Sequence, residues 1–263
     1  MSPRISIITT SFNASSTIAH TLDSVLSQEF GDFEHLIIDG ASSDETLAIV
    51  ERFQARYEDG GKILRVYSQR DSGLYDGMNR GLERARGEIV GFLNADDFYT
   101  HSRVLDLISW AFDKPDGIGV CYGNVLYVDS ALSPLRQLKG APFSPLGFKL
   151  GAHPPHPSFY ARRELYTRYG GFSPRYGIAA DYELMLRLLY KHRAKSLYID
   201  DTLVTMRAGG VSNASLANIV RANLECAKAW RDLDLSLFPA FIPLKVLRKL
   251  GDRLITLVGG GRP

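Results

Sequence analysis

Strands and helices alternate from the first residues of this chain, and that alternation restricts the fold more than any other feature. The apolar run Ile5–Thr10 precedes an amphipathic helical pattern over Ser15–Gln28. The runs His35–Asp39 and Ile63–Tyr67 then flank a second helical pattern over Asp44–Tyr57. Strands joined through right-handed helical crossovers lie parallel. The sequence therefore predicts an α/β three-layer sandwich with a central, mostly parallel sheet.

Short polar and acidic residues stand at or just after the ends of the predicted strands. They are Thr9, Thr10, Asp39, Asp71, Asp96 and Asp97. Ligands of open α/β sheets bind beyond the carboxyl ends of the strands. We therefore expect these side chains to line one binding cleft at that edge of the sheet.

The run Ile89–Asp97 places Asn94 and two carboxylates, Asp96 and Asp97, after an apolar strand. Paired carboxylates in a cleft can hold a divalent cation, and such a cation can bind the diphosphate of a nucleotide. Aspartates are also common at the start of a helix, so this run alone leaves a capping role open.

A glycine-punctuated segment, Ser68–Gly81, carries Asn79 and Arg80 on a predicted helix. No G-x-G-x-x-G pattern follows the first strand, and the chain has no G-K-[ST] motif. These absences argue against a dinucleotide-binding fold and a P-loop.

Composition further limits the classes of protein to which this chain can belong. A chain of 263 residues with 45% hydrophobic residues can bury one full core. The net charge of +2 gives no support for nucleic acid as a partner. Cys121 and Cys226 lie far apart, which argues against a disulfide framework or a zinc site. The opening residues lack the pattern of a signal peptide, so we expect a cytoplasmic protein.

Five segments in order resemble the inverting family 2 glycosyltransferases with the GT-A fold, and among these the bacterial enzymes of polysaccharide and O-antigen assembly. They are SIITTSFN at 6–13, SVLSQ at 24–28, IDGASSDET at 38–46, DSGLYDGMNRG at 71–81 and LNADD at 93–97. The resemblance covers about the first four-fifths of the chain. It implies a GT-A catalytic domain over 1–213 and leaves a helical C-terminal extension over 214–263.

The resemblance also implies a donor site for a nucleotide-diphospho-sugar. Thr10 and Asp39 would line the pocket for the base and ribose, and Asp71 and Asn79 would close its far side. One departure concerns the base contact, because Gly40 stands where the family often has a second acid.

The acidic motif would carry Mn²⁺ or Mg²⁺ against the sugar diphosphate. The resemblance assigns this role to Asp96 and Asp97, with Asp96 also on the donor. A hard cation there would neutralise the departing nucleoside diphosphate. The first position of the motif is Asn94 rather than Asp, so the metal would depend on the two aspartates.

An inverting transferase also needs a general base for the acceptor hydroxyl. Asp181 stands at the start of a predicted helix, where it is either an N-cap or that base, and the resemblance favours the base. His156 is predicted to contact the acceptor or the departing phosphate, with a packed loop histidine as the alternative. Arg207 resembles part of the family's loop that closes over the diphosphate, with a surface arginine as the alternative.

The C-terminal extension ends in a basic amphipathic pattern over 244–258. Its apolar face carries Leu247, Leu250, Leu254 and Val258. Lysines and arginines surround that face, which favours a helix on an anionic membrane surface at the inner side of the cell membrane. The alternative is a helix that packs on the domain or on a second subunit as a homodimer contact.

Together these features predict transfer of a sugar to a glycan acceptor carried on polyprenyl diphosphate. Two other functions remain open at this point. A metal-dependent nucleotidyltransferase would need a cationic loop after the first strand, where Thr9–Asn13 has no cation. A nucleotide-sugar-binding protein without turnover would not require Asp96, Asp97 and Asp181 together.

Overall fold

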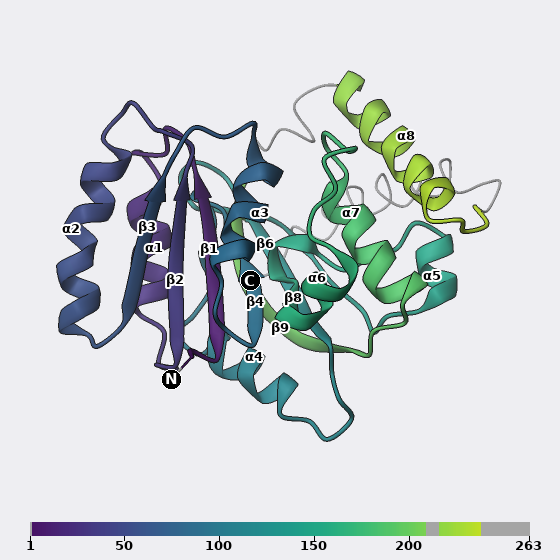
Figure 1. The fold of residues 1–263 in the computed structure, drawn as a ribbon, viewed down its shortest axis with the longest axis horizontal. Coiled ribbons are helices and arrows are strands. Elements are labelled where there is room, and N and C mark those ends of the chain that lie inside the picture. Colours follow the sequence, from purple (N-terminus) through teal and green to yellow (C-terminus); the bar gives the residue numbers. More distant parts are fainter. Residues whose placement is uncertain (1, 209–215, 238–263) are drawn as a thin grey trace.

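The computed structural model describes residues 2–208 and 216–237, and the strands within them form one sheet. The strand order is β3-β2-β1-β4-β8-β6-β9-β5, with β7 paired to β6 (Figure 1). The strands are β1 (Ile5–Ser11), β2 (Phe33–Asp39), β3 (Ile63–Ser68), β4 (Ile89–Phe92), β5 (Phe98–Tyr99), β6 (Val120–Val128), β7 (Pro134–Leu138), β8 (Tyr160–Arg162) and β9 (Ser196–Arg207).

Most of the sheet runs in one direction. Strands β1 to β4 are mutually parallel, and the antiparallel strand β8 returns the direction to β6 and β9, which pair parallel to each other. Strands β5 and β7 run against their neighbours β9 and β6. The prediction of a mostly parallel sheet is confirmed.

Helices cover both faces of the sheet and complete three layers (Figure 1). The helices are α1 (Ile18–Leu26), α2 (Thr46–Asp59), α3 (Leu74–Arg84), α4 (Val104–Phe112), α5 (Pro145–Lys149), α6 (Arg163–Tyr169), α7 (Ala180–Met185) and α8 (Leu216–Asp232). Neighbouring residues of β1 show the layering, because successive strand side chains point to opposite faces. Ile7 packs with α1, α2 and α4 in one core cluster, whereas Ile8 packs with α3, α6 and α7 in the other.

The predicted strands and helices of the N-terminal half are confirmed with small shifts at their ends. Helix α1 begins at Ile18 rather than Ser15, because Ala14–Thr17 forms a turn in which the N–H of Thr17 donates to the carbonyl of Ala14 (3.0 Å). Helix α7 begins at Ala180 and continues as a π-helix over Leu186–Lys191.

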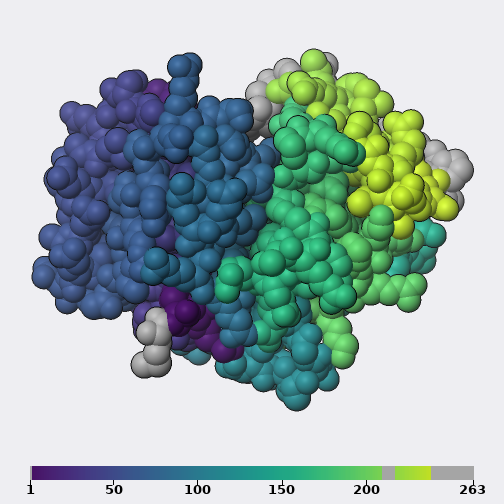
Figure 2. All heavy atoms as spheres, in the orientation of Figure 1, coloured from purple at the N-terminus to yellow at the C-terminus, as the bar shows by residue number. Residues whose placement is uncertain are grey.

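Helix α8 lies in the predicted helical extension and packs on α7, and Figure 2 shows it as the yellow-green surface beside the green residues of the C-terminal part of the fold. Trp230 is fully buried, and its indole N–H donates to the hydroxyl of Tyr182 on α7 (2.9 Å). The predicted membrane-surface helix over 244–258 lies outside the described residues. Among the described helices, none is both long enough and apolar enough to cross a bilayer.

Candidate active site

The nucleotide side of the site lies where β1 and β2 end. The loop after β3 brings Asp71 beside Gly40, where an added Cβ would lie only 3.0 Å from the Asp71 carboxylate. An added Cβ at Gly77 on α3 would lie 3.1 Å from the methyl group of Thr10 and 3.3 Å from Asp71. The two glycines therefore let Thr10 and Asp71 approach each other, as the sequence predicts. The hydroxyl of Thr10 is buried and has no hydrogen-bond partner among the described residues.

Asp39 is fully buried at the end of β2 and is surrounded by donors. Its Oδ1 accepts from the hydroxyls of Ser11 (3.0 Å) and Ser42 (2.5 Å). Its Oδ2 accepts from the Ser42 backbone N–H (2.9 Å) and the Ser68 hydroxyl (2.8 Å). Because Ser11 and Ser68 belong to the two flanking strands, this carboxylate joins three strand ends into one surface.

The side chain of Asn79 on α3 forms two hydrogen bonds with a loop that is distant in the sequence. Its amide N–H donates to the carbonyl of Phe172, and its Oδ1 accepts from the N–H of the same residue (2.8 Å each). The structure thus uses this side chain to connect α3 with the loop that precedes α7. Its predicted donor contact stays a prediction.

The metal side of the site lies in the turn between β4 and β5. Asp97 is fully buried, and its Oδ2 accepts from the amide of Asn94 (3.1 Å). Within the described residues, Oδ1 of Asp97 and Oδ1 of Asn94 are buried without a hydrogen-bond partner. Burial raises the pKa of Asp97 well above its usual range, and the neighbouring Asp96 raises it further. The turn therefore contains buried oxygens whose hydrogen-bonding capacity the described atoms do not use.

These atoms fit a divalent cation. Carboxylate and amide oxygens are the ligands that Mg²⁺ and Mn²⁺ accept, and unpartnered buried oxygens are otherwise rare. The described part of the chain contains no group of three or more His, Cys, Asp or Glu side chains at metal-binding distances. Asp96 and Asp97 would thus supply part of a coordination shell, and the donor's phosphates would have to supply more of it.

Arg207 ends β9 beside the acidic turn. Its Nη2 donates to Nδ1 of His20 on α1 (2.9 Å), and its guanidinium lies 5.5 Å from the centre of the Phe98 ring. Burial raises the pKa of Asp96, whereas the charge of Arg207 lowers it. The charge of Arg207 thus acts on both Asp96 and Asp97, and its predicted diphosphate contact stays a prediction. His20 and Phe98 carry no recognisable motif, so the sequence did not identify them.

Asp181 lies in the first turn of α7, across the cleft. Its Oδ1 accepts from the Tyr75 hydroxyl (3.3 Å) and from the Tyr182 backbone N–H (2.8 Å). Its Oδ2 lies 3.8 Å from Nδ1 of His156. Burial lowers the pKa of His156, although Asp181 partly opposes this shift, so a neutral imidazole faces the carboxylate near neutral pH. The structure thus brings together the predicted base and the predicted acceptor-side histidine.

The hydroxyl of Tyr127 on β6 is influenced by both acidic groups. Burial raises the pKa of its hydroxyl, the charge of Arg136 lowers it, and the charges of Asp97 and Asp181 both raise it. The guanidinium of Arg136 lies 4.1 Å from the centre of the Tyr127 ring. The charges of Asp97 and Asp181 therefore both act on the Tyr127 hydroxyl. Tyr127 and Tyr75 are further site residues that the sequence did not reveal.

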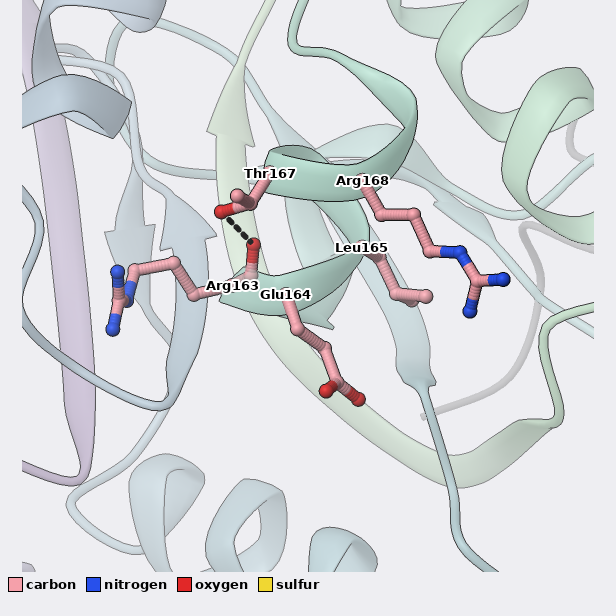
Figure 3. Close-up of a pocket in the computed structure, with 5 residues that line it drawn as sticks. All are labelled: Arg163, Glu164, Leu165, Thr167 and Arg168. Carbon is pink, nitrogen blue, oxygen red and sulfur yellow. Dashed lines mark hydrogen bonds between the residues drawn. The ribbon is translucent and has the colours of Figure 1, made fainter.

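A separate hollow of about 360 Å³ lies along α6 and contains none of these residues. Figure 3 shows its charged side chains, Arg163, Glu164 and Arg168, pointing in different directions. Side chains that diverge cannot bind one small ligand together, so this hollow is not a competing active site.

A mostly parallel α/β sheet with an acidic turn after β4 is the arrangement expected of the GT-A fold. The sequence profile described as "Glycosyl transferase family 2" matches residues 6–168, so the chain belongs to this family of glycosyltransferases. A PGL/p-HBAD biosynthesis glycosyltransferase of Mycobacterium bovis is 29% identical over 212 residues, which are 80% of each chain. A putative teichuronic acid biosynthesis glycosyltransferase, TuaG of Bacillus subtilis, is 39% identical over 142 residues, which are 54% of each chain.

Solved structures share the fold. A mannosyltransferase from Pyrobaculum calidifontis, solved in complex with GDP-Man and Mn²⁺, has a TM-score of 0.64 and 19% sequence identity. The match covers 98% of this chain and 75% of that one. The GT-A fold predicted from the sequence is confirmed.

Proposed function

We propose that this glycosyltransferase is an inverting, metal-dependent enzyme that transfers a sugar from a nucleotide-diphospho-sugar to a glycan acceptor. One observation carries the proposal: buried oxygens of Asn94 and Asp97 in the acidic turn have no hydrogen-bond partner among the described residues. A bound Mn²⁺ or Mg²⁺ would supply electrostatic stabilisation for the charge on the departing diphosphate. Asp96 and Asp97 would hold it, and Arg207 would add a second positive charge.

Asp181 is the proposed general base. A base must be ionised and within reach of the acceptor hydroxyl, and the half-buried carboxylate of Asp181 is open to the cleft. The Tyr75 hydroxyl and the Tyr182 N–H both donate to its Oδ1, which fixes the carboxylate and leaves Oδ2 to accept the proton. Attack from the Asp181 side, opposite the metal side, would invert the anomeric centre.

Thr10 and Asp71 are the proposed contacts for the nucleotide base, with Asp39 and Asn79 organising the pocket behind them. Support comes from the buried Thr10 hydroxyl without a partner and from the close approach of Asp71 to Gly40. A buried hydroxyl of this kind is a ready partner for a polar ligand atom.

The acceptor that we propose is a lipid-linked glycan of bacterial cell-surface polysaccharide synthesis. Support comes from relatives named for PGL and teichuronic acid biosynthesis. The basic amphipathic pattern over 244–258 would hold the enzyme on the inner face of the membrane. Sedimentation with liposomes, with and without anionic lipid, tests this. Equal recovery of the full-length and the tail-deleted protein in the supernatant would contradict membrane binding.

A panel of nucleotide sugars with Mn²⁺ or Mg²⁺ tests the reaction itself. We expect one donor to raise the melting temperature only when metal is present. Asp181→Asn should bind that donor normally and lose 10²- to 10⁴-fold in turnover, about the contribution of a general base. Glu164→Gln on α6, outside the cleft, is the matched control and should keep full turnover.

Two outcomes would overturn the proposal. If Asp181→Asn retains near-normal turnover while folded, another group is the base. If a donor binds with metal but is neither transferred nor hydrolysed by the wild type, the protein is a nucleotide-sugar-binding protein instead.

A further inference from the structure

His20 contacts the guanidinium of Arg207 without being part of any motif. An arginine side chain has only hydrogen-bond donors, so Nδ1 of His20 must accept from Nη2 of Arg207 and the imidazole proton must lie on Nε2. Burial and the charge of Arg207 lower the pKa of His20, while Asp23 opposes the shift. The neutral imidazole that the geometry requires is thus also the form that its surroundings favour.

The imidazole is itself held in place. Its ring stacks on Phe98 at a centroid separation of 3.9 Å and an interplanar angle of 21°. Phe98 follows Asp97 directly and pairs with Thr205 of β9, two residues before Arg207. Because residues two apart in a strand share a face, the Phe98 ring lies on the side of β9 that carries Arg207. Helix α1 also holds the acidic turn, since the Thr21 hydroxyl donates to the carbonyl of Asp97 (2.7 Å).

His20 and Thr21, adjacent residues of α1, thus position both Arg207 and the acidic turn. His20 holds the cation at the end of β9, and Thr21 holds the backbone of Asp97. Arg207 also keeps one buried donor, Nε, without a partner in the described part of the chain. A guanidinium anchored through Nη2 that keeps Nε as a free donor is prepared to bind an anion, because its orientation is already fixed.

We propose that His20, supported by the Phe98 ring, is a positioning residue that orients Arg207 beside the Asp96–Asp97 turn for binding the diphosphate of the donor. This inference rests on the proposed diphosphate contact of Arg207. Every nucleotide-diphospho-sugar carries the same diphosphate, so the role of His20 does not depend on the base or the sugar. Without the imidazole, the long arginine side chain would have to be ordered at the moment of binding.

Inorganic pyrophosphate with Mn²⁺ is a suitable probe, because it contains only the group in question. Isothermal titration should show binding to the wild type and about tenfold weaker binding to His20→Leu, which lacks the acceptor atom. His20→Asn places an amide oxygen near the position of Nδ1 and should recover most of the affinity. Phe98→Leu removes the stack and should weaken binding by about threefold. Melting curves for each variant report whether the fold is retained.

A double mutant separates positioning from a general structural effect. Arg207→Met should weaken binding at least as much as His20→Leu, and the double variant should bind no more weakly than Arg207→Met alone. Additive losses, or wild-type binding by folded His20→Leu, would overturn the role of His20 and leave the proposed function intact. If Arg207→Met binds as the wild type does, the diphosphate contact of Arg207 fails and this inference fails with it. Absence of binding by the wild type would count against the metal–diphosphate site itself.

Discussion

Asp39 and Asp97 are both fully buried carboxylates, placed after β2 and β4, the parallel strands on either side of β1, yet their surroundings differ. Asp39 receives four hydrogen bonds from three serines, whereas Asp97 receives one side-chain bond from Asn94 and keeps an unpartnered oxygen. A buried charge with a full set of donors supports the fold, and one with an incomplete set costs stability unless a ligand completes it. The nucleotide side is therefore largely built before the ligand binds, and the metal side is not.

The largest effect that we expect from this comparison is on the free energy of unfolding. Asp39→Ala should lower the free energy of unfolding by about 3 kcal/mol, because it removes four hydrogen bonds to a buried carboxylate and leaves the buried Ser11 hydroxyl without its acceptor. Urea denaturation measures this. Asp71→Ala, whose carboxylate is half-buried, is the control and should cost much less. Equal costs for the two variants would show that hydrogen bonding does not distinguish these carboxylates.

A second prediction concerns His35, which belongs to the same well-satisfied half. Thr9 donates to its Nε2 (2.9 Å), and its Nδ1 donates to the Tyr57 hydroxyl (2.9 Å), which in turn donates to the Leu22 carbonyl (3.1 Å). This network needs a neutral ring, and burial lowers the pKa of His35 from 6.5 to about 3. Below pH 6.5 the unfolded state therefore binds a proton that the folded state does not.

Stability should consequently be complete above pH 6.5 and fall as the pH drops from there toward 3. The loss should be about 2 kcal/mol at pH 5, from a slope of about 1.4 kcal/mol per pH unit for one proton. Urea denaturation at pH 7.5 and pH 5 measures it. His35→Gln can still accept from Thr9 but cannot titrate, so its stability should change less over the same interval. An equal change in both proteins would assign the acid sensitivity to other groups.

The sequence predicted the residues at the strand ends well, because strand and helix patterns are local features of a sequence. Strand periodicity and helix patterns place Thr10, Asp39, Asp71 and Asp97 at strand ends, and the parallel topology then brings those ends together. Contacts across the cleft could not be predicted in this way. The bond from Tyr75 to Asp181 joins residues 106 positions apart, and the bond from Arg207 to His20 joins residues 187 apart.

Such pairs depend on how the antiparallel strands β8 and β5 close the sheet, and no short motif encodes that closure.

Asn79 also shows that a motif does not reveal the contacts of its residues in the folded chain. Its position in a motif predicted a ligand contact, whereas its amide connects α3 to Phe172 in the folded chain. Patterns thus identified the polar residues of the site, and only the three-dimensional structure showed which of them contact each other.

The smallest effect that we predict is on Asp97, and it tests most directly how this carboxylate differs from Asp39. Burial and Asp96 raise the pKa of Asp97, so this carboxyl destabilises the metal-free protein at pH values above its usual pKa. Asp97→Asn removes this charge with little change in shape and should stabilise the metal-free protein at pH 7.5 by about 1 kcal/mol, while abolishing stabilisation by Mn²⁺ with a donor. The gain should shrink as the pH falls through the raised pKa, because Asp97 is then neutral in the wild type as well. Thermal melts with and without Mn²⁺ measure both effects. A clear loss of metal-free stability would instead place Asp97 with Asp39, as a carboxylate that the fold needs.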